Sequence, residues 1–237
     1  MESTLVIVPT YNEIENIEKV INLVLNLNDK FNLLIVDDSS PDKTSNKVRD
    51  LMSQFPERLF LEERKNKTGL GGAYIAGFNW ALKRNYNYIF QMDADLSHNP
   101  MILIEMLNEL KGGRDVIVGS RYVNGINVVN WPLNRILLSK FASYYVKLIT
   151  GMPFKDPTSG FVGYRRKVLE SISLNEIKFV GYAFQIELKF NAWKRNFLIK
   201  EHSIIFKNRE KGVSKMNSSI IWEAIYGVIQ LRFNNKK

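Results

Sequence analysis

Two aspartates one residue apart, Asp93 and Asp95, follow the apolar run at residues 86–90. In an extended segment the side chains of residues i and i+2 project to the same side, so both carboxylates can meet one cation. Mg²⁺ and Mn²⁺ prefer oxygen ligands and commonly share them with the phosphates of a substrate. The pattern therefore indicates a metal and diphosphate site at the end of a strand, although a lone Asp-x-Asp is also typical of ordinary turns.

Polar residues follow two other predicted strands as well. The strand at 4–8 leads into the polar segment at 9–13, and the strand at 31–36 leads into Asp37 and Asp38. The carboxyl ends of parallel strands share one edge of a sheet, and α/β proteins bind their ligands outside that edge. Three polar strand ends at one edge are hard to explain by turns alone, so they favour a binding site.

The elements that must position these residues alternate along the chain. Short apolar runs and helical patterns follow one another, which is typical of βαβ units and a mostly parallel sheet. We predict strands at 4–8, 31–36, 58–61, 86–90, 115–119 and 196–206, with a turn and short strand at 158–164. We predict helices at 13–27, 43–55, 73–84, from Pro100 onward, at 131–150, at 182–195 and at 218–233. The glycine cluster at 69–72 is not a G-x-G-x-x-G motif and follows no clear strand, which argues against a dinucleotide-binding fold.

Composition limits the classes of protein that the chain can represent. Its 237 residues fit one domain, or one domain with an appended segment, and 45% apolar with 24% charged residues is typical of a globular chain. The absence of cysteine excludes a disulfide framework and thiolate metal sites and favours a reducing compartment. We expect neither a signal peptide nor a transmembrane helix. The net charge of +9 predicts an anionic partner: nucleic acid, phospholipid headgroups or a phosphorylated substrate.

Two segments of the second half are apolar enough to lie on a membrane surface. Residues 131–150 combine Leu, Ile, Phe and Tyr with Arg135, Lys140 and Lys147, and residues 218–233 carry charges only at Glu223 and Arg232. Such a helix lies at a membrane interface, binds a partner protein or packs on the core. The sequence leaves these alternatives open.

Several short motifs occur in an order and at a spacing that resemble a known family. They are Pro9-Thr10-Tyr11-Asn12-Glu13, Val36-Asp37-Asp38-Ser39-Ser40-Pro41-Asp42, Gly69-Leu70-Gly71, Met92-Asp93-Ala94-Asp95-Leu96-Ser97-His98, Gly119-Ser120-Arg121-Tyr122 and Arg209-x-x-Gly212-x-Ser214-Lys215. The chain resembles the polyprenol monophosphomannose synthases, also called dolichol-phosphate mannose synthases, among the inverting glycosyltransferases of family two. The resemblance covers nearly the whole chain. The motifs at 119–122 and 209–215 are the ones that indicate the branch acting on polyprenyl phosphates.

The resemblance implies both a fold and an activity. The fold is an α/β, Rossmann-like GT-A fold for nucleotide sugars, with residues 1–215 as the glycosyltransferase domain, residues 216–237 as a C-terminal amphipathic helix and no transmembrane domain. The activity is metal-dependent, inverting transfer of a hexose to a polyprenyl phosphate, with mannose from GDP-mannose favoured. A polyprenyl-phosphate glucosyltransferase or another enzyme using a UDP-sugar is the alternative, followed by a non-catalytic basic binding module.

The resemblance also implies where the protein works and with which partners. The expected location is the cytoplasm, peripheral at the cytoplasmic face of a membrane. The expected partners are the nucleotide-sugar donor, the polyprenyl phosphate and the membrane surface, with a membrane-anchoring partner protein as an option and without nucleic acid.

Roles for individual residues come from the same resemblance. Asp95, Arg121 and Arg209 are the expected catalytic residues, and Arg135 and Ser139 are expected to bind the acceptor phosphate. The residues expected to bind the nucleotide sugar are Pro9, Tyr11, Glu13, Val36, Asp38, Asp93, Ala94, Asp95, Arg121, Arg209 and Lys215. Asp93 and Asp95 are the expected ligands of Mg²⁺ or Mn²⁺, and Ser97 stands where some relatives place a longer amide ligand. His98 is expected to start the next helix or to face solvent.

The charge of the acceptor determines the chemistry that these residues must supply. A polyprenyl phosphate is already an oxyanion near neutral pH, so it needs no base to remove a proton. Gln185 and Glu187 match positions at which related enzymes with hydroxyl acceptors carry acidic residues, and we assign no general base here. The difficulty is instead to bring two anions together, which a divalent cation and a cluster of arginines would offset.

Overall fold

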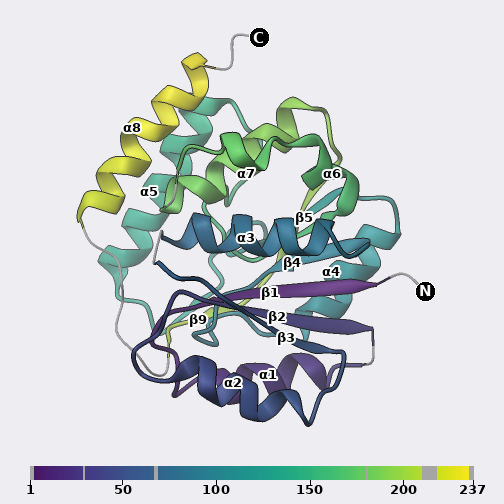
Figure 1. Cartoon of the computed structure of the whole chain (residues 1–237). Helices are drawn as coiled ribbons and strands as arrows, with labels where there is room; N and C mark the ends of the chain where they lie inside the picture. The colour runs from purple at the N-terminus through teal and green to yellow at the C-terminus, as the bar shows by residue number, and fades with distance from the viewer. Residues whose placement is uncertain (1–2, 29, 67–68, 180, 210–217, 235–237) are drawn as a thin grey trace.

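A seven-stranded sheet in the order β3-β2-β1-β4-β7-β5-β8 runs through the protein (Figure 1). This computed structural model describes residues 3–28, 30–66, 69–179, 181–209 and 218–234. The strands of the sheet are β1 Thr4–Thr10, β2 Phe31–Asp37, β3 Leu59–Glu63, β4 Tyr88–Gln91, β5 Val116–Ser120, β7 Val162–Arg165 and β8 Ile199–Ser203. A separate two-stranded sheet pairs β6, Val128–Val129, with β9, Phe206–Lys207.

One strand of the main sheet runs against the others. β7 lies between β4 and β5 and is antiparallel to both, while β1, β2, β3, β4, β5 and β8 form parallel pairs. Gly163 of β7 stands opposite Phe90 of β4, and a Cβ atom on Gly163 would lie 2.4 Å from the Phe90 ring. Glycine therefore lets the ring lie across β7. Because β7 is reversed, the segment that enters it lies at the edge where its neighbours end.

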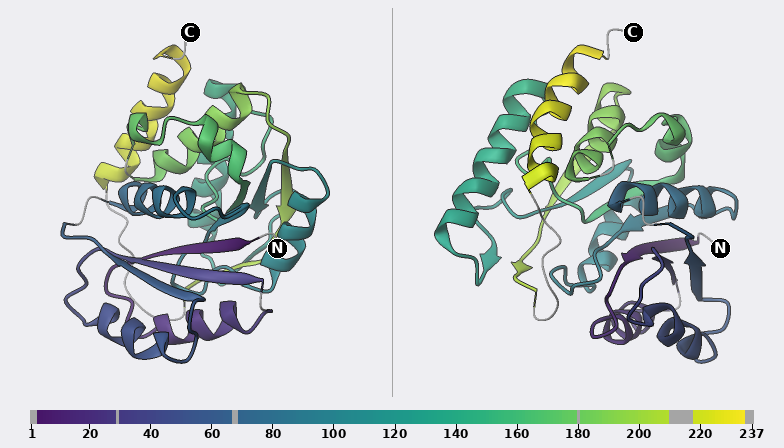
Figure 2. Two further views of the ribbon diagram at one scale, coloured as in Figure 1. Left: turned by 45° about the vertical axis from the view of Figure 1, so that its right-hand side comes forward. Right: turned by 60° about the vertical axis from the view of Figure 1, so that its left-hand side comes forward.

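Helices cover both faces of the sheet and separate two apolar cores (Figures 1 and 2). The helices α1 Ile17–Leu25, α2 Thr44–Met52 and α4 Ile102–Lys111 pack on one face. The other face carries α3 Leu70–Leu82, α6 Arg166–Ser171, the short 3₁₀ helix Leu174–Glu176 and α7 Tyr182–Lys194. Along β1, Val6 and Val8 enter the first core while Leu5 and Ile7 enter the second, because successive side chains of a strand point to opposite faces.

Two further helices lie outside these layers. α5, Leu133–Thr150, and α8, Ser218–Asn234, lie side by side, and α8 also packs against α7 (Figure 2). The Tyr145 hydroxyl of α5 donates to the Ile225 carbonyl of α8 at 2.9 Å. The boundary at residues 215/216 falls outside the described residues. In the part of the chain that the structure describes, no helix has both the length and the apolar character needed to cross a membrane.

The predicted strand at 196–206 is wrong as a single element. It consists of β8 and β9, separated by Ile204 and Ile205, because the chain leaves the main sheet after Ser203 to pair with β6. Helix α3 also begins three residues earlier than predicted, at Leu70, directly after Gly69 with its φ of 88°. The glycine cluster therefore forms the start of a helix.

Candidate active site

Asp93 and Asp95 lie at the carboxyl end of β4, beside the ends of β1 and β2. The Ser97 backbone N–H donates to Asp95 Oδ1 at 3.1 Å. Leu96, which lies between Asp95 and Ser97, has a φ of 60°, an uncommon backbone conformation for a residue other than glycine. The turn after β4 is thus held so that its backbone supports the Asp95 carboxylate. Ala94 is buried in the same turn.

Asp93 accepts a hydrogen bond from an aromatic hydroxyl on one side. The Tyr74 hydroxyl of α3 donates to Asp93 Oδ1 at 3.3 Å. Burial raises the pKa of the Asp93 carboxyl above its ordinary value and the negative charge of Asp95 adds to this, while His98, Tyr74 and Arg209 oppose it. Two neighbouring carboxylates in such a place are stabilised in the ionised form by a bound cation.

His98 is neither solvent-exposed nor part of a helix, contrary to expectation. Only 3% of it is exposed, and α4 begins four residues later at Ile102. Its ring stacks on Phe161 with centroids 4.8 Å apart and meets the Phe206 ring at 5.2 Å. Burial lowers the pKa of His98, so the neutral ring is favoured. His98 belongs to an aromatic cluster, which the isolated sequence gave no reason to expect.

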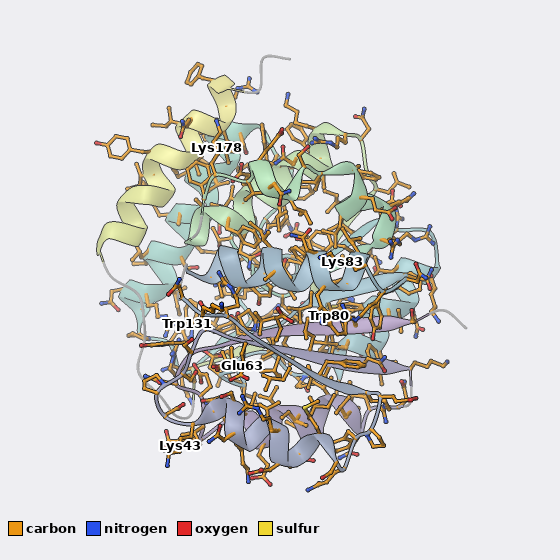
Figure 3. The ribbon with its side chains drawn as sticks, in the orientation of Figure 1. Lys43, Glu63, Trp80, Lys83, Trp131 and Lys178 are labelled. Atoms are coloured by element: carbon orange, nitrogen blue, oxygen red, sulfur yellow. The ribbon has the colours of Figure 1, made fainter. Side chains whose placement is uncertain are left out.

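The aromatic cluster continues to two of the predicted arginines. The Trp131 ring meets Phe206 at 5.3 Å, and Trp131 lies on the side of the sheet away from the N-terminus (Figures 1 and 3). The guanidinium carbon of Arg135 lies 3.9 Å from the Trp131 ring centroid, and that of Arg121 lies 5.7 Å from it. Guanidinium groups bind aromatic faces in this way. Arg121 and Arg135 therefore flank the same indole ring.

The loop after β9 brings a third arginine to the carboxylates. Arg209 Nη2 lies 3.2 Å from Asp95 Oδ2. Its neighbour Asn208 accepts a hydrogen bond from Arg135 Nη1 at 2.8 Å. The Lys207 N–H donates to the Ser97 carbonyl at 3.2 Å, which ties this loop to the turn after β4. Lys215 lies outside the described residues.

Ser139 lies close to the same group through its tyrosine partner. The Tyr122 hydroxyl donates to Ser139 Oγ at 2.8 Å, and the Tyr122 ring lies 5.2 Å from the Arg121 guanidinium carbon. Arg135 and Ser139 are four residues apart on α5, which places them on one side of the helix. The structure thus brings Asp93, Asp95, Arg121, Arg135, Ser139 and Arg209 to one edge of the sheet.

Arg121 is oriented by a buried carboxylate that sequence reasoning missed. Its Nε and Nη2 atoms donate to the two oxygens of Asp156 at 2.7 and 2.6 Å, and Nη2 also donates to Thr158 Oγ1 at 2.9 Å. Burial acts to raise the pKa of Asp156, but the Arg121 charge and hydrogen bonds outweigh it and leave that pKa below its ordinary value. The only signal in the sequence was a polar stretch, 156–160, before an apolar strand.

A buried lysine lies under the segment 156–160. Lys189 of α7 is fully buried, and its Nζ donates to the Ser159 carbonyl at 2.7 Å. Ser159 Oγ in turn donates to the Gly119 carbonyl at the end of β5, at 2.6 Å. Burial lowers the pKa of Lys189 to about 7, with the Asp156 charge opposing this shift. Lys189 therefore links α7 to the two segments that carry Arg121 and Asp156.

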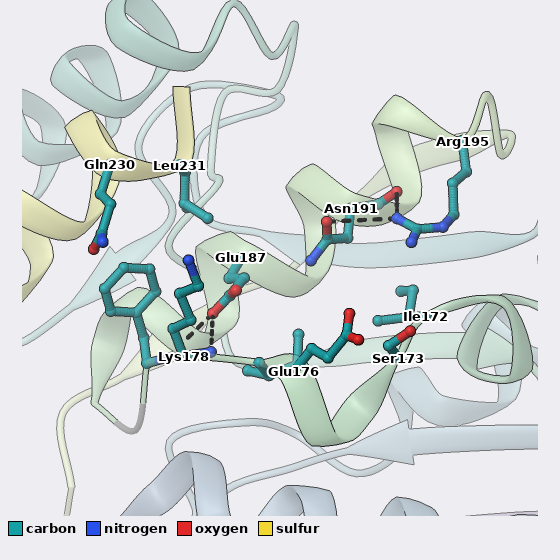
Figure 4. A pocket seen from close by; sticks show the side chains of 11 residues that line it. Ile172, Ser173, Glu176, Lys178, Glu187, Asn191, Arg195, Gln230 and Leu231 are labelled. Carbon is teal, nitrogen blue, oxygen red and sulfur yellow. Dashed lines mark hydrogen bonds between the residues drawn. The ribbon is translucent and has the colours of Figure 1, made fainter. Parts of the chain in front are cut away.

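Gln185 and Glu187 of α7 lie in different surroundings. Gln185 is 2% exposed and neither of its amide atoms has a hydrogen-bond partner among the described residues. The Glu187 carboxylate accepts from the backbone N–H groups of Lys178 and Phe179 at 3.0 and 3.2 Å. It lines a cavity of about 370 Å³ between α7, the segment before it and α8 (Figure 4), and burial raises the pKa of Glu187.

The residues expected at the nucleotide end lie at the ends of β1 and β2. Asp38 forms an ion pair with Arg64 at 2.8 Å, and Glu13 accepts from Asn16 Nδ2 at 3.0 Å. Pro9 and Tyr11 are half-buried at the end of β1. The Val36 side chain is fully buried in the core shared with α3, which leaves its backbone as the part near the edge.

Asp37, which the sequence placed at a polar strand end without a binding role of its own, connects these strand ends. Asp37 Oδ2 accepts from Thr10 Oγ1 at 2.8 Å and from Ser40 Oγ at 2.6 Å. Asp37 is fully buried and joins the end of β1 to the loop after β2. Its role is therefore to fix the edge of the sheet on which a nucleotide would lie.

The donor set at Asp93 and Asp95 fits a hard divalent cation. Among the residues described here, no three His, Asp or Glu side chains gather into a metal-binding group, so the protein would supply two carboxylates and a substrate or water the remaining ligands. Burial raises the pKa of the Asp93 carboxyl, and a cation bound beside it would lower that pKa again and favour the ionised form. Ser97 is buried, and its described bonds are those of its backbone to Asp95 and Lys207.

Comparison with solved structures identifies the fold. The chain superposes on a crystal structure of glucosyl-3-phosphoglycerate synthase from Mycobacterium tuberculosis with a TM-score of 0.73, covering 97% of this chain and 80% of that one at 16% identity. A second structure of that enzyme, in complex with Mn²⁺, UDP and glucosyl-3-phosphoglycerate, gives a TM-score of 0.70 over 98% of this chain and 79% of that one, at 17% identity. The predicted α/β, GT-A fold with a mostly parallel sheet is confirmed.

Curated relatives are more similar in sequence. The chain is 43% identical to the polyprenol monophosphomannose synthase of Mycolicibacterium smegmatis over 97% of this chain and 86% of the relative. It is 38% identical to the undecaprenyl-phosphate mannosyltransferase of Micrococcus luteus over 94% and 91% of the two chains. It is 35% identical to the dolichol-phosphate mannosyltransferase of Pyrococcus furiosus over 95% and 62%. The resemblance found in the sequence motifs is therefore confirmed.

A family model covers the main sheet except β8, together with Asp93, Asp95, Arg121 and Arg135. The model described as glycosyl transferase family 2 matches residues 5–173, which is well over half of the chain. With the fold, the site and the relatives in agreement, the chain belongs to glycosyl transferase family 2.

Proposed function

We propose that this protein is a metal-dependent inverting glycosyltransferase that moves mannose from GDP-mannose to the phosphate of a polyprenyl phosphate. The observation that carries the proposal is the convergence of two carboxylates with Arg121, Arg135 and Arg209 at one edge of the sheet. The three relatives are named as mannose synthases or mannosyltransferases of polyprenol, undecaprenyl phosphate and dolichol phosphate, which supports this choice.

The donor would lie across the ends of β1, β2 and β4. The nucleoside part would meet Tyr11, Glu13 and Asp38, and the diphosphate would lie toward Asp95, Arg209 and Arg121. Guanidinium groups suit phosphates because their fixed fork of donors binds two oxygens at once. The ion pair between Arg209 and Asp95 supports the proposal, since it places a phosphate-binding group next to a cation-binding one. Lys215 would add a further positive charge.

Mg²⁺ or Mn²⁺, held by Asp93 and Asp95, would supply a positive charge opposite the departing diphosphate. The protein's own groups would do the rest. Arg121, held by Asp156, and Arg209 would neutralise the diphosphate oxygens while they gain negative charge.

The acceptor phosphate would be received by α5. Arg135 and Ser139 lie on the side of the helix that meets Trp131 and Tyr122, next to Arg121. An acceptor oxygen would form the new bond to the anomeric carbon as the bond to the diphosphate breaks on the other side, which inverts the configuration. No proton is removed in this step, so no base is needed. The buried, uncharged Gln185 is in keeping with such an acceptor.

The outer face of α5 supports a membrane-bound acceptor. Large apolar side chains are exposed along one stripe of this helix: Leu133, Leu137, Phe141, Tyr144 and Leu148. On α8, Tyr226 and Phe233 are exposed as well. Lys140 and Lys147 are exposed on α5, where they could meet anionic headgroups. Both helices would lie in the interface at the cytoplasmic face of a membrane, where a separate membrane protein could add a further anchor.

The test is a transfer assay with a defined acceptor. Purified protein is incubated with Mg²⁺ or Mn²⁺, a short polyprenyl phosphate and, in parallel, GDP-mannose, UDP-glucose and other nucleotide sugars. Lipid-linked mannose with inverted anomeric configuration is expected from GDP-mannose. Product from a UDP-sugar alone would change the donor, and product formed only on a hydroxyl acceptor would overturn the substrate class.

A pair of variants distinguishes binding of the acceptor from binding of the donor. Arg135→Ala is expected to raise the KM for the polyprenyl phosphate about tenfold or more, because a charged hydrogen bond to the phosphate is lost. Its Kd for the nucleotide sugar should stay that of the wild type. Lys83→Ala, which changes an exposed lysine directly after α3, is the control. Equal effects of both changes on the KM would argue against an acceptor site at Arg135.

A further inference from the structure

A small polar hollow lies over the α-carbon of Gly160, in the segment that enters β7. The three atoms nearest to the place where a Cβ would stand are Gln185 Nε2 at 3.6 Å and the two Asp93 carboxylate oxygens, each at 3.8 Å. An amide donor and a carboxylate acceptor thus face the same point from opposite segments of the chain. Glycine keeps this point open, although its φ lies outside the left-handed region and a Cβ here would make only ordinary contacts, so neither the backbone conformation nor a clash within the protein requires a glycine.

The Gln185 side chain brings an unused amide to this hollow. It is 2% exposed, and neither Nε2 nor Oε1 has a hydrogen-bond partner among the described residues. A buried amide without partners is costly, and each such group in a folded protein calls for an explanation. The neighbouring Phe184 ring stacks on Tyr74 with centroids 6.0 Å apart and planes only 2° from parallel. This stack packs α7 against α3 and so positions the backbone that carries Gln185.

The opposite wall of the hollow is also held in place. Tyr74 donates to Asp93 Oδ1 at 3.3 Å, so the carboxylate is oriented from the α3 side. An ionised carboxylate has about four lone-pair sites, so it can accept from Tyr74 and still bind a cation and one more donor. A group that donates to Asp93 and accepts from Gln185 Nε2 would fit the hollow. A hydroxyl does both, whereas a phosphate oxygen would be repelled by Asp93.

We propose that Gln185 is a specificity-determining residue that binds one hydroxyl of the transferred hexose in the hollow over Gly160, with Asp93 as its second partner. The inference rests on the proposed function of the same site, because it takes the donor to be a nucleotide sugar bound at Asp93 and Asp95. Gln185 then selects the sugar, while the strand ends of β1 and β2 select the nucleotide.

The first test removes a hydroxyl from the sugar, or the amide of Gln185 from the protein, and compares the effects on binding. The Kd values of GDP, GDP-mannose and the monodeoxy derivatives of GDP-mannose are measured with Mn²⁺ for the wild type and for Gln185→Met, which keeps the side-chain volume. For the wild type, one deoxy derivative is expected to bind about tenfold to hundredfold more weakly, because it leaves buried polar groups unpaired. Gln185→Met should bind GDP-mannose more weakly by a similar factor and should not distinguish that derivative from GDP-mannose. GDP should bind both proteins equally.

Other outcomes would overturn the proposal. If Gln185→Met discriminates every deoxy derivative as the wild type does, the hollow holds water only. If it loses GDP and GDP-mannose equally, Gln185 has a structural role. If the wild type transfers no sugar, the proposed function fails and this inference fails with it.

The second test fills the hollow without touching α7. In Gly160→Ala the new Cβ lies 3.6 to 3.8 Å from its neighbours, which is ordinary van der Waals contact, so the thermal unfolding temperature is expected to stay that of the wild type. The Kd for GDP-mannose should rise at least tenfold, while the Kd for GDP is unchanged. Gly112→Ala, at the end of α4 and away from the hollow, is the control for binding; its Cβ would lie 3.3 Å from the Asn108 carbonyl, so its unfolding temperature is recorded alongside. An unchanged Kd for GDP-mannose in Gly160→Ala would show that no sugar hydroxyl occupies the hollow.

Discussion

The guanidinium of Arg121 and the carboxylate of Asp156 form a two-pronged ion pair, with Nε and Nη2 of the arginine on separate oxygens at 2.7 and 2.6 Å. The Arg121 backbone N–H also donates to Asp156 Oδ2 at 3.0 Å. Asp156 is fully buried, and the Arg121 side chain is 11% exposed. The carboxylate therefore fixes both the main chain and the side chain of the arginine that we propose to meet the diphosphate.

We predict that Asp156→Asn destabilises the protein strongly. Removing the negative charge leaves the mostly buried Arg121 guanidinium without its counter-charge, and loss of one partner of a buried pair costs about 3–5 kcal/mol. Chemical denaturation gives the free energy of unfolding. Glu170→Gln is the control, because its ion pair with Arg166 lies on the surface and is worth about 0–1 kcal/mol. Similar losses in the two variants would contradict this account of Asp156.

The carboxylate of Asp95 should be needed for catalysis and not for folding. We expect Asp95→Asn to lower the rate of transfer about a hundredfold or more, because it removes a proposed ligand of the cation that would offset the leaving diphosphate. The measurement is the transfer rate as a function of Mn²⁺ concentration, with thermal unfolding recorded alongside. Asp50→Asn, on the exposed side of α2, is the matched control. Wild-type activity of Asp95→Asn at limiting Mn²⁺ would overturn the assignment.

Lys189 should make the stability of the protein depend on pH. Its pKa is about 7 in the folded protein against an ordinary 10.5, so between these values the unfolded chain binds more protons than the folded one. Stability must then rise with pH in this window, by up to about 1.4 kcal/mol per pH unit, and the penalty is complete only below pH 7. Asp156, Arg121 and Glu201 are the charges that act on it.

The measurement is the difference in free energy of unfolding between the wild type and Lys189→Met at several pH values from 7 to 9. Taking the difference cancels the groups common to both proteins. The wild type is expected to gain on the variant as the pH rises. Lys194→Met, exposed on the same helix, should show a constant difference. A constant difference for Lys189→Met would mean that this lysine titrates as an ordinary one.

The exposed stripe on α5 should hold the protein on lipid vesicles. Phe141 and Leu148 are each 67% exposed, and burying such a side chain is worth about 1.5–3 kcal/mol. We expect the double change Phe141→Ser and Leu148→Ser to weaken sedimentation with anionic vesicles at least tenfold at low salt. Leu198→Ser, which alters an exposed leucine at the start of β8 and at the other edge of the sheet, is the control. Equal binding of both proteins would remove α5 from the membrane contact.

Local patterns were enough to predict the framework of the site. The strands that end at Thr10, Asp37 and Gln91 were each marked by an apolar run followed by polar residues, and the structure places all three at one edge. Such runs encode which face of a strand is buried. They do not encode the partner or direction of a strand, so the reversed β7 between β4 and β5 was not foreseen.

The parts of the site that were missed depend on contacts between distant segments. The sequence around Arg121 does not predict its contact with Asp156, and the sequence around Gln185 does not predict its position beside Gly160. His98 was misplaced because a histidine after a strand is commonly exposed, whereas here Phe161 and Phe206 enclose it. The predicted single strand at 196–206 was wrong for a similar reason. The pairing of β9 with β6 decides where the chain leaves the main sheet.

The direction of β7 has a consequence for how this architecture can change. The chain leaves the end of β5 at Arg121, forms α5 and returns 35 residues later to Asp156 at the same point, joined there by the ion pair. A segment whose two ends meet can be lengthened or replaced at a modest cost in chain entropy. Helix α5, which we propose to meet the lipid, thus belongs to a segment whose two ends are fixed at one place. Changes within this segment would leave the carboxylates after β4 in their positions.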